Sequence, residues 1–314
     1  CEGGGGGGGG CAHYDACAMA KELSGLPILI TGAGTGIGRA TALACARAGM
    51  PVVAMGRRME PLRALAEEGA RLRDVSGAPA GRIVPFAGDV TSEEACAGAV
   101  EACRKEFGGL YAAFANAGYG VERAMHEMSD KELRDIFECN FFGTMHTLRP
   151  AIPLMKEAGR GHALICSSCV SKFTLPFYGA YSATKAAQNH VARAMRLELR
   201  PWGIHVSSVH PVGTRTEFFD VVQQRSEAPK LVSHGPDWVL QRPERVARAI
   251  VRCLRRPRAE VWTSAPVRLG MALAMPFPGV SDRVIRKMVE ERRRNYDIRN
   301  AQGEGAGGAE SAGA

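Results

Sequence analysis

The sequence has no apolar segment long enough to cross a bilayer and no secretory signal. Its clearest apolar run, 267–280 (VRLGMALAMPFPGV), contains two prolines, and a membrane-spanning helix needs about 20 apolar residues. Residues 1–22 lack the apolar core of a signal peptide. An internal repeat is also absent. We therefore expect a cytoplasmic protein with a non-repetitive fold.

The ten cysteines form no disulfide framework. Their scatter indicates a reducing compartment, in which most thiols act as small core residues. The spacing of Cys166-Ser-Ser-Cys169 is that of a redox pair, but it brackets a candidate catalytic serine and lacks a thioredoxin-like context. A metal cluster of Cys11, His13 and Cys17 is an alternative that we do not favour. We expect no metal site.

Low-complexity sequence lies at both ends of the chain. Gly3–Gly10 are consecutive glycines without apolar surface to bury, and Met19 is the first methionine. We expect residues 1–22 to be a disordered extension, with Met19 as the natural start. Residues 23–300 are expected to form one domain whose C-terminal part lies on the substrate side. The Gly- and Ala-rich tail, 301–314, is expected to be disordered.

Positive charge is concentrated in the C-terminal part. The formal net charge is +8, and residues 242–299 hold 15 Lys or Arg against 6 Asp or Glu. The densest clusters are Arg255-Arg256-Pro-Arg258 and Arg292–Arg294. They are not accompanied by a nucleic-acid-binding module or interleaved aromatic residues, so we expect solvated helix faces and no nucleic-acid partner.

The apolar run 267–280 has three interpretations. It covers the substrate pocket, it forms a subunit interface, or it rests with its basic flanks (267–294) on an anionic membrane surface as a peripheral contact. We favour the first two over the third.

Short apolar strands alternate with amphipathic helices along most of the chain, which is typical of a single α/β domain with a parallel sheet. The predicted strands are 26–31, 51–55, 82–87, 110–115, 162–167, 204–209 and 260–263. The predicted helices include 37–48, 92–107, 130–156, 180–200 and 243–256.

A glycine-rich turn follows the first predicted strand. The sequence TGAGTGIG (31–38) separates this strand from a helix that ends at Gly49. Glycines let a backbone approach a pyrophosphate, and a helix N-terminus offers free N–H groups. This context predicts a dinucleotide site, and a glycine turn without a ligand is the alternative. The predicted site residues are Gly32, Thr35, Gly36, Ile37 and Gly38.

Ser168, Tyr181 and Lys185 are the candidate catalytic residues. Tyr181 and Lys185 are four positions apart, so a helix places both on one face. We expect the ammonium to lower the pKa of the phenol, which then exchanges a proton with a substrate oxygen. Ser168 follows the apolar run 163–166, where its hydroxyl is expected to hold the same oxygen. For the Tyr/Lys pair alone, two unrelated surface residues are the alternative.

Together these motifs resemble the short-chain dehydrogenase/reductase family, in its compact single-domain branch. The resemblance runs from about Leu23 to about Trp262. The matching motifs are TGAGTGIG, Asp89-Val90, Ala115-Asn116-Ala117-Gly118, Asn140, Ser168, Tyr181 and Lys185. It implies a Rossmann-like, doubly wound, seven-stranded parallel sheet in the order 3-2-1-4-5-6-7, with helices on both faces. The cofactor then lies at the carboxyl ends of the strands.

The resemblance also implies roles for individual residues. Asp89 and Val90 bind the adenine, Asn116 steadies the central strand, and Asn140 holds a water that links Lys185 to solvent. Lys185 also binds the nicotinamide ribose. The segment 211–216 occupies the place of the family's Pro-Gly segment, although Val212 replaces the glycine, and contributes Thr214 and Thr216. A helix-terminal acid at Asp89 and a structural amide at Asn140 are the alternatives.

Cofactor choice depends on the end of the second predicted strand. NAD-preferring relatives carry an acid at the position of Gly56, whereas here Arg57 and Arg58 follow a glycine. Because guanidinium groups suit a 2′-phosphate, we favour NADP(H) over NAD(H). Two arginines that merely begin a solvated helix are the alternative. Many NADP-dependent relatives also carry a basic residue where this chain has Thr35.

The predicted reaction is reversible hydride transfer between NADP(H) and a carbonyl/alcohol pair, with Tyr181 as proton donor or acceptor. Apolar residues in the substrate segments favour a lipophilic substrate. They are Phe173, Leu175, Phe177, Tyr178, Val212, Phe218, Phe219 and Trp238. The alternatives are an NAD(H)-dependent enzyme of this fold and a non-catalytic NADP(H)-binding regulator. The resemblance further implies a homodimer or homotetramer.

Overall fold

The computed structural model describes residues 22–74, 77–173, 175–219, 222, 240–280, 282–283, 285–287 and 289–290. Several predictions concern residues outside these ranges. They are the predictions for the two chain ends, for Cys11, His13 and Cys17, for Trp238 and for Arg292–Arg294. The division into an extension, a domain and a tail stays a prediction.

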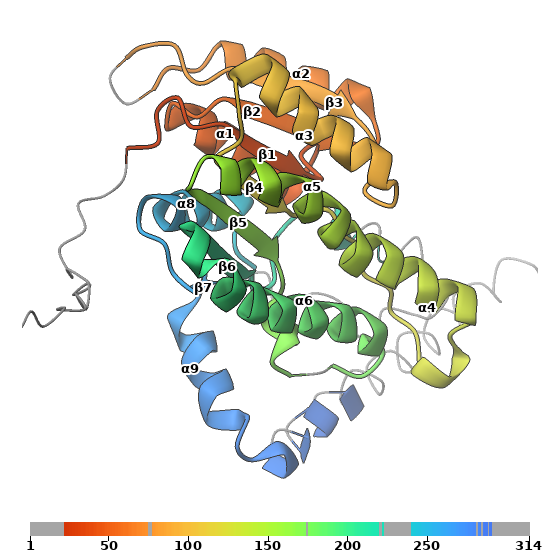
Figure 1. Cartoon of the computed structure of the whole chain (residues 1–314). Helices are drawn as coiled ribbons and strands as arrows, with labels where there is room; N and C mark the ends of the chain where they lie inside the picture. Colours follow the sequence, from red (N-terminus) through yellow and green to blue (C-terminus); the bar gives the residue numbers. More distant parts are fainter. Residues whose placement is uncertain are drawn as a thin grey trace, which may run out of the picture.

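A parallel seven-stranded sheet forms the centre of the molecule (Figure 1). Its order is β3-β2-β1-β4-β5-β6-β7, which confirms the predicted topology. The strands are β1 (Ile28–Thr31), β2 (Val52–Gly56), β3 (Ile83–Ala87), β4 (Ala112–Ala115), β5 (Gly161–Cys166), β6 (Ile204–His210) and β7 (Glu260–Trp262). Winding reverses between β1 and β4, so the carboxyl ends of these two strands flank the switch point at which such sheets bind ligands.

Helices cover both faces of the sheet (Figure 1). One face packs against α1 (Gly36–Arg47), α2 (Met59–Ala70) and α8 (Pro243–Arg255). The other packs against α3 (Glu93–Phe107), α5 (Gly143–Glu157) and α6 (Gly179–Glu198). Also present are α4 (Asp130–Phe137), α9 (Ala265–Ala274) and the short helices η1 (Met125–Glu127), η2 (Glu138–Phe142), η3 (Cys169–Ser171) and η4 (Arg200–Trp202).

Strand β1 shows why its first three residues are all apolar. Ile28 and Ile30 belong to the core on the α1 face, and Leu29 belongs to the core on the α3 face. All three side chains are fully buried, because alternate residues of a strand point to opposite faces and helices cover both.

The structure differs from the predicted helix 130–156. Helix α4 ends at Phe137, a π-helical turn spans Glu138–Phe142, and α5 begins at Gly143. The turn contains Asn140, whose side chain is fully buried and bonded to the neighbouring loop. Such π-turns often mark functional positions. The structure also contains α2 and α9, which are absent from the predicted helices.

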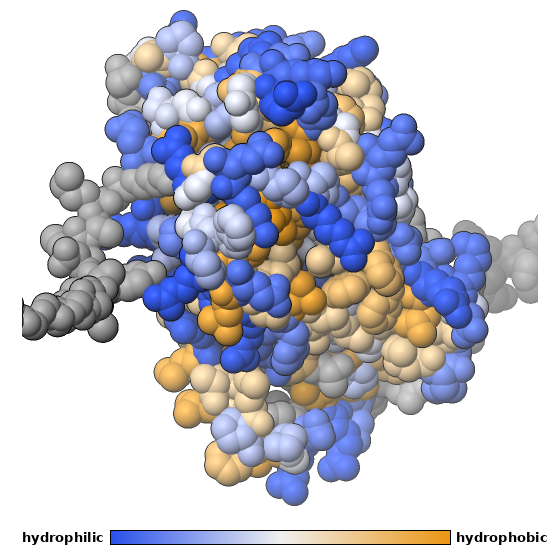
Figure 2. Space-filling view, in the orientation of Figure 1, coloured by the Kyte–Doolittle hydropathy of each residue, from blue (hydrophilic) through white to orange (hydrophobic). Residues whose placement is uncertain are grey.

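Helix α9 extends from the β7 edge of the sheet (Figure 1). None of its residues is buried, and Leu269 and Leu273 are 62% and 65% exposed. Figure 2 shows apolar surface at this lower end of the molecule, to which Met275, Phe277 and Val280 also contribute exposed side chains. Among the described residues, no helix has the length and apolarity needed to cross a membrane.

Candidate active site

The glycine turn after β1 brings the first turn of α1 close to the strand end. Gly32 and Gly36 adopt left-handed φ values of +63° and +53°. A Cβ on Gly38 would lie 2.2 Å from the Gly32 carbonyl oxygen. Thr35, the N-cap residue of α1, makes no side-chain capping bond. The helix N-terminus therefore presents backbone N–H groups beside a surface kept open by missing side chains, which fits a pyrophosphate.

Asn116 joins the carboxyl ends of β1 and β4. Its Nδ2 donates to the Thr31 carbonyl oxygen over 2.9 Å. The Thr31 hydroxyl accepts from the N–H groups of Asn116 and Ala117 at 3.0 and 3.2 Å. These bonds hold the two strands that flank the switch point in a fixed relation.

A cavity of about 790 Å³ opens above these strand ends. It brings together most of the predicted site residues. Those that line it are Gly32, Thr35, Gly36, Ile37, Arg57, Arg58, Asp89, Val90, Asn116, Ser168, Tyr181, Lys185, Thr214 and Thr216. Gly38 and Asn140 do not line it: Gly38 lies under the glycine turn, and Asn140 is buried beside Gly118.

One wall of the cavity is closed by the segment that follows β6. Thr216 lies against the glycine turn, since a Cβ on Gly36 would approach its side chain to 3.0 Å. The next residue, Glu217, forms an ion pair with Arg58 at 3.6 Å. Both partners are well exposed, at 59% and 70%. Sequence reasoning missed Glu217, because nothing in the sequence places this segment opposite the end of β2.

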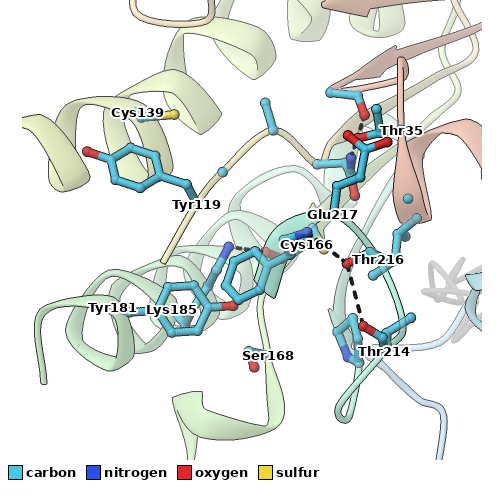
Figure 3. Close-up of a pocket in the computed structure, with 18 of the residues that line it drawn as sticks. Thr35, Tyr119, Cys139, Cys166, Ser168, Tyr181, Lys185, Thr214, Thr216 and Glu217 are labelled. Carbon is cyan, nitrogen blue, oxygen red and sulfur yellow. Dashed lines mark hydrogen bonds between the residues drawn. The ribbon is translucent and has the colours of Figure 1, made fainter. Parts of the chain in front are cut away.

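Ser168, Tyr181 and Lys185 lie together at one side of the cavity, and Thr35, Thr214, Thr216 and Glu217 lie at the other (Figure 3). Ser168 lies close enough to the Tyr181 hydroxyl to lower the pKa of the phenol. Ser168 Oγ also accepts from the Val170 N–H over 3.3 Å. Lys185 Nζ donates to the Cys166 carbonyl oxygen over 2.8 Å and lies 5.5 Å from the centre of the Tyr181 ring.

Burial dominates the titration of this group. Removal from water raises the pKa of Tyr181 far above its usual value near 10, and the neighbouring Ser168 side chain offsets this only in part. Burial also lowers the pKa of Lys185. The predicted lowering of the Tyr181 pKa is therefore wrong for this structure, because desolvation of the phenol is the largest cause that acts on it. The protonated phenol is the favoured form.

The side chain of Asn140 bonds within the protein. Its Oδ1 accepts from the Tyr119 N–H, and its Nδ2 donates to the Tyr119 carbonyl oxygen, both over 2.9 Å. The backbone carbonyl of Asn140 accepts from Thr144 Oγ1 at 2.8 Å and from Gln188 Nε2 at 2.6 Å. Asn140 thus anchors the loop after β4 to α5 and α6, and its water-holding role stays a prediction.

Apolar side chains surround the catalytic group. The ring of Tyr181 lies 5.4 Å from that of Phe218 and 6.2 Å from that of Tyr178. Of the predicted substrate-side residues, those that line the cavity are Phe173, Leu175, Tyr178, Val212, Phe218 and Phe219. Phe177 does not line it. Further apolar lining residues that sequence reasoning missed include Tyr119, Cys139, Val170 and Leu240.

None of the described residues of 267–280 lines the cavity. One of the two favoured interpretations was that this run covers the substrate pocket. For the part of the chain described, that interpretation is wrong. The subunit interface and the peripheral membrane contact stay predictions.

A glycine cradle and a Ser/Tyr/Lys group at opposite sides of one cavity suit a nicotinamide-dependent oxidoreductase. The sequence profile described as short chain dehydrogenase matches residues 27–227, more than half of the chain. The chain belongs to the short-chain dehydrogenase/reductase family. As a member of this family, it is an NAD(P)-dependent oxidoreductase that acts on CH–OH or carbonyl groups.

Three relatives illustrate the family. A Myxococcus xanthus protein described as an uncharacterized oxidoreductase is 35% identical over 196 residues, 62% of this chain and 75% of that protein. An alcohol dehydrogenase from the archaeon Thermococcus sibiricus, complexed with 5-hydroxy-NADP, is 27% identical, with 76% and 95% of the two chains covered and a TM-score of 0.63. A 3-ketoacyl-(acyl-carrier-protein) reductase from Brucella melitensis, complexed with NADH, is 26% identical, with 76% and 97% covered and a TM-score of 0.66. Because these two structures hold different nicotinamide cofactors, family membership does not select between NAD and NADP.

Proposed function

We propose that this dehydrogenase/reductase reduces a lipophilic ketone or aldehyde with NADPH. The observation that carries the proposal is the placement of Ser168, Tyr181 and Lys185 opposite the glycine cradle in one cavity with an aromatic wall. The aromatic and aliphatic side chains favour a lipophilic substrate because its burial there removes apolar surface from water.

The proposed chemistry assigns a step to each polar group. Ser168 Oγ accepts the Val170 N–H, which leaves its own proton to donate to the substrate oxygen. Tyr181 donates a second hydrogen bond to that oxygen and then its proton, so that the carbonyl becomes an alcohol. A bound NADPH supplies the hydride for the carbonyl carbon. Lys185 holds its ammonium beside the phenol and is positioned to bind the nicotinamide ribose.

Protonation of Tyr181 supports the reductive direction. A tyrosine with a raised pKa is a proton donor at neutral pH, and reduction needs a donor. Oxidation of an alcohol needs the phenolate, so we expect it to require higher pH.

The cofactor assignment depends on Arg57 and Arg58. Both line the cavity at the end of β2, and guanidinium groups suit the adenosine 2′-phosphate. We therefore favour NADP(H) over NAD(H). We further propose that the enzyme is a cytoplasmic homodimer or homotetramer, with peripheral membrane contact through 267–294 as the weaker alternative to a subunit interface.

Absorbance of NADPH with a carbonyl panel tests this proposal. The panel contains acetophenone, decanal, a steroid ketone and a β-ketoacyl thioester, and we expect turnover of at least one of them. Tyr181→Phe should lower kcat by about a hundredfold or more, because it removes the proton donor, and should leave NADPH affinity largely intact. Tyr111→Phe is the matched control, since Tyr111 is a buried tyrosine that does not line the cavity. NADPH binding without turnover of any compound would favour a regulatory protein instead.

A further inference from the structure

The backbone carbonyl of Ser168 is held by two side chains. Ser171 Oγ donates to it over 2.7 Å, and His210 Nδ1 lies 3.1 Å from it. A carbonyl only accepts, so Nδ1 carries the proton, and His210 Nε2 accepts from the Ser208 hydroxyl at 2.9 Å. His210 is fully buried, and burial lowers its pKa, which favours this neutral tautomer.

The imidazole of His210 is in turn fixed by Trp262. The two residues are register partners in the parallel strands β6 and β7. Their rings stack with centres 4.6 Å apart and planes 10° from parallel. The stack opposes rotation of the imidazole away from Ser168.

Trp262 is oriented by a carboxylate on the same face of β7. Glu260 precedes it by two positions, and Glu260 Oε2 accepts from the indole Nε1–H over 2.8 Å. The other oxygen, Oε1, accepts from Lys172 Nζ over 2.8 Å. Lys172 and Glu260 are only 13% and 23% exposed. Lys172 comes four residues after Ser168 in the chain. The contacts from Ser168 through His210, Trp262 and Glu260 to Lys172 therefore form a closed ring.

We propose that Glu260, Lys172, Trp262 and His210 form a brace that fixes the position of the Ser168 hydroxyl during the reaction. The proposal rests on the role of Ser168 in the proposed function. None of the four side chains lines the cavity, so they are positioning residues that act through Ser168.

The energetics of the brace support a positioning role. Withdrawing two charges from water costs free energy, so a buried pair is weak evidence for stability by itself. Here the pair also holds an indole and closes a ring around the catalytic loop. The strands β5, β6 and β7 are neighbours in the sheet (Figure 1). Side chains of β7 can therefore support Ser168, which follows β5. This gives a role to the partly buried carboxylate of Glu260 in β7, a strand of three residues at the sheet edge.

Steady-state kinetics of Glu260→Gln test the brace. The assay uses the full chain with acetophenone, or the best ketone of the panel, and the corresponding alcohol. We expect kcat to fall about ten- to a hundredfold, because small displacements of a catalytic group have effects of that size. The Kd for NADPH should stay within about twofold, since no brace residue lines the cavity. Glu101→Gln is the matched control, because it breaks an exposed ion pair with Arg104 on α3.

The pH profile of alcohol oxidation separates positioning from general stability. Burial and the neighbouring thiols of Cys166 and Cys169 raise the pKa of Tyr181, and the Ser168 side chain lowers it in part. A displaced Ser168 should therefore shift the profile to higher pH, in the same direction as Ser168→Ala. A purely structural loss would lower the amplitude without shifting the profile.

Two further variants cover the case in which Glu260→Gln does not fold. Trp262→Phe keeps a ring against His210 but releases Glu260, and should reproduce part of the loss. His210→Phe should reproduce most of it, and His210→Asn should recover activity because its amide can donate to the Ser168 carbonyl.

The outcomes distinguish the brace from the proposed function. If Ser168→Ala lowers kcat while the folded Glu260, Trp262 and His210 variants keep the wild-type kcat and profile, the brace is wrong and the proposed function stands. If Ser168→Ala is fully active, the assigned role of Ser168 and the brace are both wrong. A lowered kcat with a shifted profile in both Ser168→Ala and the brace variants supports the inference.

Discussion

Cofactor preference should depend on Arg57 and on the competition between Glu217 and a phosphate for Arg58. Arg57 is exposed at the mouth of the cavity and forms no ion pair with any described residue. Arg58 pairs with Glu217 at 3.6 Å, in an arrangement that solvent reaches on both sides. We therefore expect Arg57 to be the main contact for the adenosine 2′-phosphate and Arg58 to be the second.

The magnitudes follow from these exposures. The exposed pair of Arg58 and Glu217 contributes about 0–1 kcal/mol. A charge-assisted guanidinium–phosphate contact contributes about 1.5–3 kcal/mol. Since about 1.4 kcal/mol is tenfold in affinity, Arg57→Ala should weaken NADPH by roughly ten- to a hundredfold and NADH much less. Glu217→Gln should strengthen NADPH up to about fivefold, because it frees Arg58.

Gly56→Asp should shift the preference toward NADH. An aspartate there provides a ribose acceptor and repels a 2′-phosphate. The backbone accepts the change, because a Cβ on Gly56 would meet nothing nearer than the Leu62 Cδ2 at 3.6 Å.

The assay is kcat/KM for NADPH and NADH, with a direct Kd for each, in the wild type and the three variants. Arg63→Ala is the matched control, since Arg63 is an exposed arginine of α2 that does not line the cavity. A wild type that prefers NADH would refute the assignment. An Arg57→Ala variant whose ratio of kcat/KM for NADPH to kcat/KM for NADH is unchanged would also refute it.

Three further variants have defined outcomes. Lys185→Ala should lower kcat and weaken cofactor binding together, which separates it from Tyr181→Phe in the same kinetic and binding assays. Gly38→Ala should destabilise the protein by about 1–3 kcal/mol, because its Cβ would overlap the Gly32 carbonyl oxygen; Gly270→Ala, which meets nothing within 4 Å, is the control in thermal unfolding. Glu260→Gln should lower the free energy of unfolding by about 1–3 kcal/mol at neutral pH, because it leaves the partly buried Lys172 ammonium without its carboxylate. The pKa of the Glu260 carboxyl is lowered from 4.5 to about 2. The difference in unfolding free energy between variant and wild type should therefore be complete above pH 4.5 and vanish as the pH falls through 2. A difference in unfolding free energy that persists in acid would contradict this.

The sequence alone determined the fold and the positions of the reacting groups. Buried strands such as β1 carry consecutive apolar residues, here Ile28 to Ile30, because both faces of the sheet are covered, and this pattern is local. The glycine turn and the spacing of Tyr181 and Lys185 are also local, since each depends on the geometry of a few consecutive residues.

Only the tertiary structure decided the electrostatics of the site and the groups that support it. The pKa of Tyr181 depends on burial beneath segments far away in the sequence, so the i,i+4 spacing predicted the wrong direction. The pairing of Arg58 with Glu217 joins residues separated by more than half the chain. The contacts from Glu260 to Ser168 need the β5-β6-β7 order to bring three distant segments into register. Periodicity carries no signal for such contacts, because it reports which face of an element is buried and not what packs against it.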